Sequence, residues 1–302
     1  MLTFESPQFE DRQWVQPLLD AEGSFGCEYN FANIYLWSRA WPQKIARAEG
    51  RLLTRIQGTL GLSYLYPAGT GPLAPAVDAL AQDAAAQGRP LTLVCVTEDQ
   101  RAALEAACPG RFAFEEDRDG FDYLYDINRL ADLPGKKLHA KRNHIRRFDD
   151  QFPDWLLEDI TPANVPECVE LERQWCAIRQ EEAGEDIDSV SEETVAVIEA
   201  LYHMDKLELE GALIRADGSP IAFSLGGLIT PEVFDVNFEK SFGDIQGAYP
   251  AINRELARLV RTRHPRVKWL NREDDMGLEG LRRAKLSYYP DLLLTKYTAR
   301  ES

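Results

Sequence analysis

The sequence is poor in the two side chains that most often bind metals or form cross-links. It has five cysteines, an odd number, and only four histidines in 302 residues. No two cysteines form a CxxC pair, and no histidine stands at a metal-ligand spacing beside them. We therefore expect neither a disulfide framework nor a zinc site, and we assign no metal ligand.

Long apolar runs are also missing. No run reaches eighteen apolar residues, the length needed to cross a bilayer. The first residues, MLTFESPQFEDRQW, are acidic and interrupted by a proline, unlike the basic and apolar regions of a secretory signal. We therefore expect a cytoplasmic protein with no membrane span.

Net positive charge is the third absence. The formal net charge is -16, so the overall field opposes the phosphate contacts of a general nucleic-acid binder. A local basic patch remains compatible with this background.

The length and the order of elements predict two domains. A chain of 302 residues exceeds a typical single core. Helices and short strands alternate without a short-period repeat, and the alternating segments 207–216, 220–229 and 233–239 predict neighbouring strands. A final strand is predicted at 291–297. We expect an α/β protein of α+β type, with mixed sheets, divided into residues 1–132 and 133–302. The acidic stretch 181–193 is predicted to be a solvated connector.

The basic segment LPGKKLHAKRNHIRRF, residues 133–148, contrasts with the acidic chain around it. It carries six cations and no anion, and a helical projection separates an apolar face from a cationic face. One interpretation is a surface that binds the phosphates of a nucleotide, coenzyme A or tRNA. The other is a solvated face that pairs with acidic neighbours. The candidate phosphate ligands are Lys136, Lys141 and Arg142.

Two further segments place polar side chains at predicted strand ends. Glu239 and Lys240 end one strand, and Gly247 and Tyr249 open the next helix, whose amino-terminal amides favour anions. The segment 269–290 then places polar residues directly after a strand, where α/β proteins often keep their sites. An ordinary β-α turn and a salt-bridged helix entry are the structural alternatives. The candidates in this second segment are Asn271, Arg272, Asp274 and Lys285.

Together these segments resemble a known bacterial family. LPGKKLHAKRNHIRRF, FEKSFGDIQGAYPAINREL and NREDDMGLEGLRRAKLSYYPDLLLTKY are similar to the family labelled as a domain of unknown function, DUF2156. That family is related to the C-terminal catalytic domain of phosphatidylglycerol lysyltransferase. The stretch GLRRAKLSYYP also resembles a segment of the Fem-type aminoacyltransferases. The resemblance implies two tandem domains of the acyl-CoA N-acyltransferase (GNAT) fold, with the active site in the C-terminal one.

The resemblance also implies roles for individual residues. Lys285 matches a lysine near the transfer site of the Fem-type relatives, where a cation stabilises an oxyanion or a departing ribose oxygen. Asn271, Arg272 and Asp274 are expected to line the same cleft. Glu239 and Lys240 are expected where GNAT folds open a gap between strands.

The function expected from this resemblance is an aminoacyl- or acyltransferase with no required cofactor. The donor would be aminoacyl-tRNA or an acyl-CoA, and the acceptor an amine or hydroxyl of a small molecule, peptide or lipid headgroup. Two alternatives stay open: a non-catalytic module that binds a nucleotide or other anion, and an acetyl-CoA-dependent N-acetyltransferase. The chain departs from its relatives in three ways. It lacks their membrane domain, an intact GNAT pyrophosphate signature and a recognisable general base.

Overall fold

The computed structural model describes residues 2–58, 61–183 and 187–302. It divides the chain into two compact units. Unit 1 comprises residues 1–123, 273–282 and 293–302, and unit 2 comprises residues 124–272 and 283–292. The predicted boundary between residues 132 and 133 therefore differs from this division, in which two C-terminal segments belong to unit 1.

Unit 1 is a mixed sheet with helices. Within the described residues its strands follow the order β1-β2-β3-β5-β14-β6, and β4 pairs with β2. The β3–β5 pair is parallel, and the pairs β1–β2, β2–β3, β2–β4, β5–β14 and β6–β14 are antiparallel. The strands are β1 (Gln43–Ala48), β2 (Arg51–Gly58), β3 (Gly61–Leu65), β4 (Ala68–Gly69), β5 (Thr92–Thr97), β6 (Phe112–Glu116) and β14 (Lys296–Glu301). The α-helices are α1 (Arg12–Glu22), α2 (Phe31–Ala40), α3 (Leu73–Ala86) and α4 (Glu98–Ala107).

Unit 2 is built on a second mixed sheet, with strand order β13-β7-β12-β11-β10-β9-β8 in the described residues. The β11–β12 pair is parallel, and β8, β9, β10 and β11 form antiparallel pairs with their neighbours along the chain. The strands are β7 (Asp122–Asp126), β8 (Leu156–Asp159), β9 (Glu210–Ala216), β10 (Ser219–Thr230), β11 (Val233–Ser241), β12 (Trp269–Asn271) and β13 (Leu292–Leu294).

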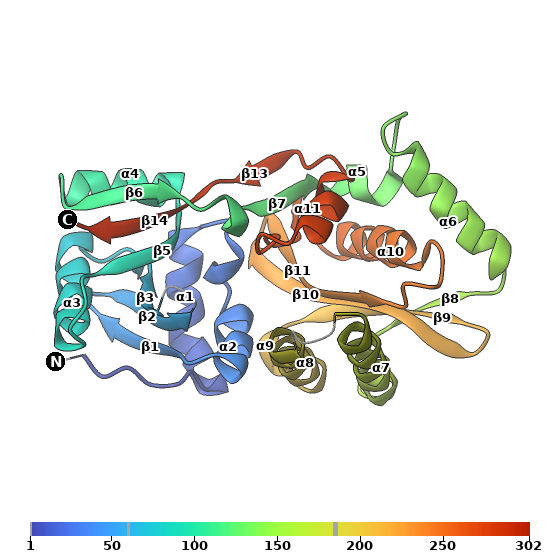
Figure 1. Ribbon diagram of the computed structural model, residues 1–302, viewed down its shortest axis with the longest axis horizontal. Helices are drawn as coiled ribbons and strands as arrows, with labels where there is room; N and C mark the ends of the chain where they lie inside the picture. Colours follow the sequence, from blue (N-terminus) through green and yellow to red (C-terminus); the bar gives the residue numbers. More distant parts are fainter. Residues whose placement is uncertain (1, 59–60, 184–186) are drawn as a thin grey trace. The chain divides into compact units, whose positions relative to one another are not determined.

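Helices cover both faces of the unit 2 sheet (Figure 1), with α10 on one face and α7 and α8 on the other. The helices are α5 (Ile127–Asp132), α6 (His139–Gln151), α7 (Val165–Ala183), α8 (Ile187–Tyr202), α9 (Met204–Leu207), α10 (Ala248–Arg263) and α11 (Glu279–Leu286). The division between the units passes through β7, α11 and β13. None of the described helices has the length and apolar character to cross a membrane.

The predicted elements correspond closely to the observed ones, with local differences. The acidic stretch 181–193 is largely helical rather than a connector, because α7 continues to Ala183 and α8 begins at Ile187; residues 184–186 of that stretch lie outside the described part. The single strand predicted at 291–297 is divided into β13 and β14. Helix α5 was not predicted.

A glycine fixes the approach of α6 to α10. Gly247, the residue before α10, has φ +90°, in the left-handed region that favours glycine. A Cβ atom there would lie 2.2 Å from the carbonyl oxygen of His144 in α6. The basic helix and the strand–loop–helix segment singled out in the sequence therefore pack together within unit 2.

Candidate functional site

The site begins where two parallel strands of unit 2 stop pairing. β12 pairs with β11 only from Val233 to Asp235 and ends at Asn271, whereas β11 continues to Ser241. Glu239, which the resemblance placed beside a gap between strands, lies in the part of β11 beyond this pairing. Asn271 is fully buried at the end of β12, and Arg272 follows it directly.

Arg272 and Glu239 form a buried ion pair across this gap. The Nη2 atom of Arg272 donates to Oε1 of Glu239 over 2.9 Å, and the two side chains are only 13% and 10% exposed. The other carboxylate oxygen of Glu239 accepts a hydrogen bond of 3.0 Å from Nδ2 of Asn253 on α10. Burial works to lower the pKa of Arg272, but Glu239, Tyr125 and Tyr288 together raise it above its usual value. Arg272 is therefore a permanent cation held by a carboxylate.

Three polar atoms around Glu239 have hydrogen-bonding capacity that the protein does not use. Oγ of Ser224, Oδ1 of Asn253 and Nη1 of Arg272 are buried without a partner among the described residues. Ser224 is the register partner of Glu239 on β10, so both side chains lie on one face of the sheet. Buried polar groups nearly always have partners. Ser224, Glu239, Asn253 and Arg272, here called the Glu239 site, are therefore a candidate binding site for a polar molecule.

An aromatic ring joins a second cation to this site. Nζ of Lys141 on α6 lies 3.9 Å from the ring centroid of Tyr288, and the guanidinium of Arg272 lies 5.0 Å from the same centroid. Tyr288 is 5% exposed. Burial lowers the pKa of Lys141 to about 8; the charge of Arg272 also lowers it, and Glu239 opposes both. The amine of Lys141 therefore loses its proton more readily than an ordinary lysine.

Lys285 holds the backbone beside the site. Its Nζ donates to the carbonyl oxygen of Arg272 over 2.5 Å, and the residue is 8% exposed. The hydroxyl of Tyr125 in turn donates to the carbonyl of Lys285 over 2.8 Å. Lys285 lies next to the expected site, but its ammonium is engaged with the main chain.

The three predicted phosphate ligands lie in different surroundings. Lys136 is exposed, whereas Lys141 is half-buried over Tyr288. Arg142 donates from one nitrogen to the carbonyls of Leu133 and Gly135, the latter over 2.8 Å, and so caps the turn before α6. The exposed cations of this segment include Lys136, Lys137 and Arg147.

Lys240 lies on the other face of β11 from Glu239. Its Nζ is 2.8 Å from Oε2 of Glu193 and 3.6 Å from the ring centroid of Trp175. Trp175 donates to the hydroxyl of Tyr249 over 3.0 Å. Burial raises the pKa of the neighbouring Glu172 to about 7, with Lys240 and Thr194 opposing. Lys240 and Tyr249 thus belong to a second polar group, between α7, α8, β11 and α10.

Asp274 belongs to unit 1, unlike Asn271 and Arg272. One of its carboxylate oxygens accepts a hydrogen bond of 3.2 Å from the amide of Met276. The next residue, Asp275, is fully buried and bound by Arg282 through two hydrogen bonds of 2.9 and 2.7 Å. Burial works to raise the pKa of Asp275, but Arg282 and Tyr123 hold it well below its usual range. This ion pair stabilises the start of α11.

Unit 1 also contains a group that resembles a metal site in its ligands. Among the described residues, Cys27, Glu28 and Asp122 bring three possible ligand atoms within 4.8 Å of one another. The ammonium of Lys296 lies 2.5 Å from Asp122 and 2.7 Å from Glu28. Burial works to lower the pKa of Lys296, but Asp122, Cys27 and Glu28 raise it well above its usual value. In this structure a lysine supplies the positive charge among these ligands.

The family model for the C-terminal region of phosphatidylglycerol lysyltransferase matches residues 22–300. The chain belongs to this family. The family resemblance inferred from the three sequence segments is thereby confirmed.

Solved structures agree with this assignment. A conserved protein of unknown function from Bacteroides thetaiotaomicron is 35% identical, with a TM-score of 0.92 over 100% of both chains. L-PGS from Bacillus licheniformis is 14% identical, with a TM-score of 0.68 over 98% of this chain and 93% of that one. FemX is 10% identical, with a TM-score of 0.55 over 98% and 96%. The last two show a shared fold.

One curated relative is more distant. An uncharacterised protein of Mycoplasmoides gallisepticum, MYCGA3080, is 21% identical over 188 residues, which is 59% of this chain. The match covers 56% of that relative, so the chain spans little more than half of its length.

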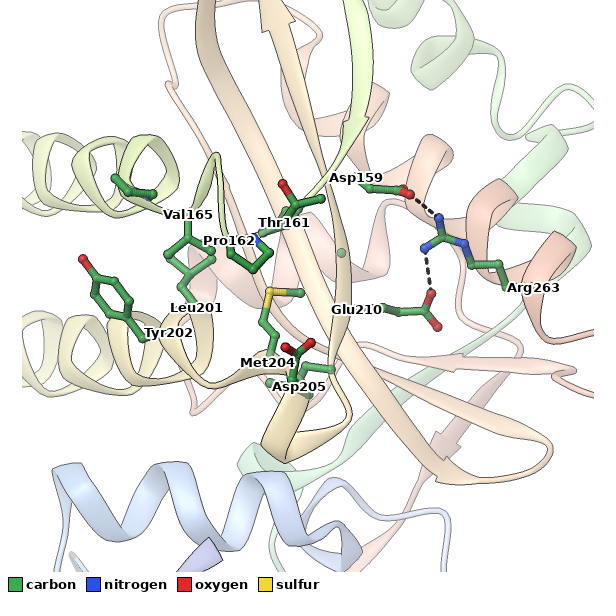
Figure 2. A pocket seen from close by; sticks show the side chains of 14 residues that line it. Asp159, Thr161, Pro162, Val165, Leu201, Tyr202, Met204, Asp205, Glu210 and Arg263 are labelled. Carbon is green, nitrogen blue, oxygen red and sulfur yellow. Dashed lines mark hydrogen bonds and ion pairs between the residues drawn. The ribbon is translucent and has the colours of Figure 1, made fainter.

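A hollow in this lysyltransferase-family chain lies apart from the Glu239 site. It is a cavity of about 290 Å³ in unit 2. Figure 2 shows that Asp159 and Glu210 both point toward Arg263 there. Arg263 is 2.6 Å from Asp159 and 2.9 Å from Glu210. Its charge is thus already satisfied, and none of the predicted site residues lines the cavity. The buried polar atoms without hydrogen-bond partners favour the Glu239 site over this cavity as the candidate functional site.

Two residues of the Glu239 site, Ser224 and Asn253, and the neighbouring Tyr288 were not predicted from the sequence. Ser224 and Asn253 stand inside a predicted strand and helix, where a single small polar residue gives no signal. Tyr288 lies in the quoted segment SYYP but resembles a core aromatic. Alternation along 220–229 and 233–239 does place Ser224 and Glu239 on definite faces, but the pairing register was needed to bring them together.

Proposed function

We propose that this family member is an aminoacyltransferase that acts by direct transfer at the Glu239 site of unit 2. The observation that carries the proposal is the Arg272–Glu239 pair, with unused hydrogen-bonding atoms on Arg272, Asn253 and Ser224. Membership of a lysyltransferase family and a fold shared with L-PGS and FemX support a transferase.

The polarity of the site suits an aminoacyl ester. Nη1 of Arg272 is an unused donor and a cation, which matches the developing negative charge on an acyl carbonyl oxygen. The carboxylate of Glu239 and Oδ1 of Asn253 are acceptors, which match an α-ammonium group. An acetyl group has no ammonium, so this combination favours an aminoacyl donor over acetyl-CoA.

Lys285 then acts as a positioning residue in this proposal. It fixes the backbone of Arg272 through the 2.5 Å hydrogen bond to its carbonyl. The resemblance assigned the stabilisation of the oxyanion to Lys285. In this proposal the Arg272 guanidinium stabilises it, because its Nη1 has no hydrogen-bond partner among the described residues.

We also propose that each unit is a GNAT-like domain. The mixed sheet of unit 2, with a parallel pair that separates after Asp235, supports this for the C-terminal unit. The likeness to FemX over 98% of the chain supports it for the chain as a whole.

The exposed cations beside α6 favour a second candidate, a module that binds an anionic ligand without catalysis. Lys136 and Lys137 precede the helix, and Arg147 lies on it, in a chain of net charge -16. In the transferase proposal the same surface meets the phosphates of the tRNA donor.

A thermal-shift and gel-shift comparison tests the proposal. We expect charged tRNA to stabilise the protein more than uncharged tRNA, and added salt to weaken both. The triple variant Lys136→Glu, Lys137→Glu, Arg147→Glu should weaken tRNA binding at least tenfold with little change in Tm. Stabilisation by acetyl-CoA alone would favour N-acetyltransfer. An equal response to charged and uncharged tRNA would favour the binding module.

A further inference from the structure

Acyl transfer to a hydroxyl or an amine needs a group that takes up a proton, and most polar groups near Arg272 already form hydrogen bonds. Glu239 accepts from Arg272 and Asn253. The hydroxyl of Tyr125 donates to a carbonyl, and Lys285 does the same. Glu239 is further held as a carboxylate by the cation of Arg272, which disfavours its protonation.

Lys141 differs from these groups. Among the described residues its Nζ contacts the ring face of Tyr288, and no hydrogen bond or ion pair holds it. The charged groups that act on it are Arg272, which follows β12, and Glu239 on β11. The cation of Arg272 and the buried surroundings both favour the neutral amine, whose lone pair can accept a proton.

We propose that Lys141 is the general base of the transfer reaction, a role that rests on the aminoacyltransferase function proposed above. Lys141 and Arg272 lie against one aromatic ring, so one group can receive the proton while the other stabilises the carbonyl oxygen. Enzymes place a general base so that its neutral and charged forms are both accessible near the working pH. No general base was recognisable in the sequence, and Lys141 takes that role in the proposed reaction.

The proposed step moves one proton through Lys141. The neutral amine of Lys141 takes the proton from the acceptor hydroxyl or amine while the acceptor oxygen or nitrogen forms a bond to the acyl carbon. The carbonyl oxygen becomes an oxyanion beside Arg272. When the carbonyl re-forms, the ester C–O bond breaks, and the ammonium of Lys141 returns the proton to the departing ribose oxygen. No proton or electron is gained or lost overall.

The decisive variants are Lys141→Arg and Lys141→Met, measured for aminoacyl transfer from charged tRNA over a pH series. In the unmodified protein the rate should rise with pH and level off above about pH 8, because only the neutral amine accepts a proton. Arginine keeps the charge and the contact with Tyr288 but stays protonated. Both variants should therefore lose about 10²- to 10⁴-fold in rate, together with the rise near pH 8. Full activity in Lys141→Arg would instead show an electrostatic role and overturn the proposal.

Competitive acetylation with acetic anhydride separates this proposal from the function on which it rests. Labelling of Lys141 in the intact protein, followed by mass spectrometry, should reach half its maximum near pH 8, with exposed Lys136 as the reference for reagent access. Half-maximal labelling in the ordinary lysine range, about pH 10.4, would overturn the role of Lys141 even if transfer occurs. If labelling occurs near pH 8 but the unmodified protein transfers nothing, the proposed function fails, and the catalytic role fails with it.

Discussion

Replacing Arg272 with methionine should reduce aminoacyl transfer by about 10²- to 10³-fold, the usual effect of removing one donor from an oxyanion site. The physical reason is the position of its guanidinium, whose Nη2 pairs with Glu239 and whose Nη1 has no hydrogen-bond partner in the described part of the chain. The measurement is the transfer rate from charged tRNA under single-turnover conditions. Because the change leaves Glu239 buried without its cation, the double variant Arg272→Met, Glu239→Gln should be measured beside it.

Arg215 offers a matched control. It lies on β9, its side chain is 17% exposed, and it forms ion pairs with Glu158 and Glu167. Arg215→Met should cost some stability but leave the transfer rate within about threefold of the unmodified protein. Equal loss of transfer in the Arg215 and Arg272 variants would mean that Arg272 acts through folding, and the assigned site would be wrong.

Replacing Lys296 with methionine should lower the free energy of unfolding by about 3–5 kcal/mol, because it leaves the buried carboxylate of Asp122 and the partly buried carboxylate of Glu28 without their cation. Lys296 is fully buried and contacts Asp122 and Glu28 directly. Its pKa is raised in the folded state, so the stabilisation is fully present below the ordinary lysine pKa of about 10.4 and is lost only above it. Urea unfolding at neutral pH therefore measures the whole effect.

Lys268→Met is the control for this prediction. Lys268 is 63% exposed and pairs with Glu232 on the surface, where such pairs contribute about 0–1 kcal/mol. Adding Asp122→Asn to Lys296→Met should restore part of the lost stability, because it removes one of the two uncompensated charges. A cost no greater than that of Lys268→Met would show that the Lys296 group does not stabilise unit 1 as a charge cluster.

Local sequence patterns predicted most elements of unit 2. Alternation predicted the strands observed as β9, β10 and β11, and glycine before proline marked the start of α10. The predictions that failed concern pairing between segments distant in the sequence. The strand predicted at 291–297 ends beside β5 and β6 of unit 1 as β14, and no local pattern specifies which sheet a C-terminal strand joins.

The candidate site was predictable in part. Polar residues after a strand indicated Asn271 and Arg272, and the family segment indicated Lys285. Lys141 was predicted from the sequence as a phosphate ligand with Lys136 and Arg142, because charge along a helix does not show which cation faces a buried aromatic ring. Its position over Tyr288 depends on the packing of α6 that Gly247 permits.

The central claim is tested most directly by following the aminoacyl group itself. Bulk tRNA charged with radiolabelled amino acids would be incubated with the protein and a mixture of small amine and hydroxyl acceptors, and the acid-insoluble counts followed with time. We expect the unmodified protein to accelerate the loss of counts from tRNA into acid-soluble products, and Arg272→Met not to do so. Identical time courses for the unmodified protein, Arg272→Met and a sample without protein would contradict the assignment of an aminoacyl transfer site at Glu239 and Arg272.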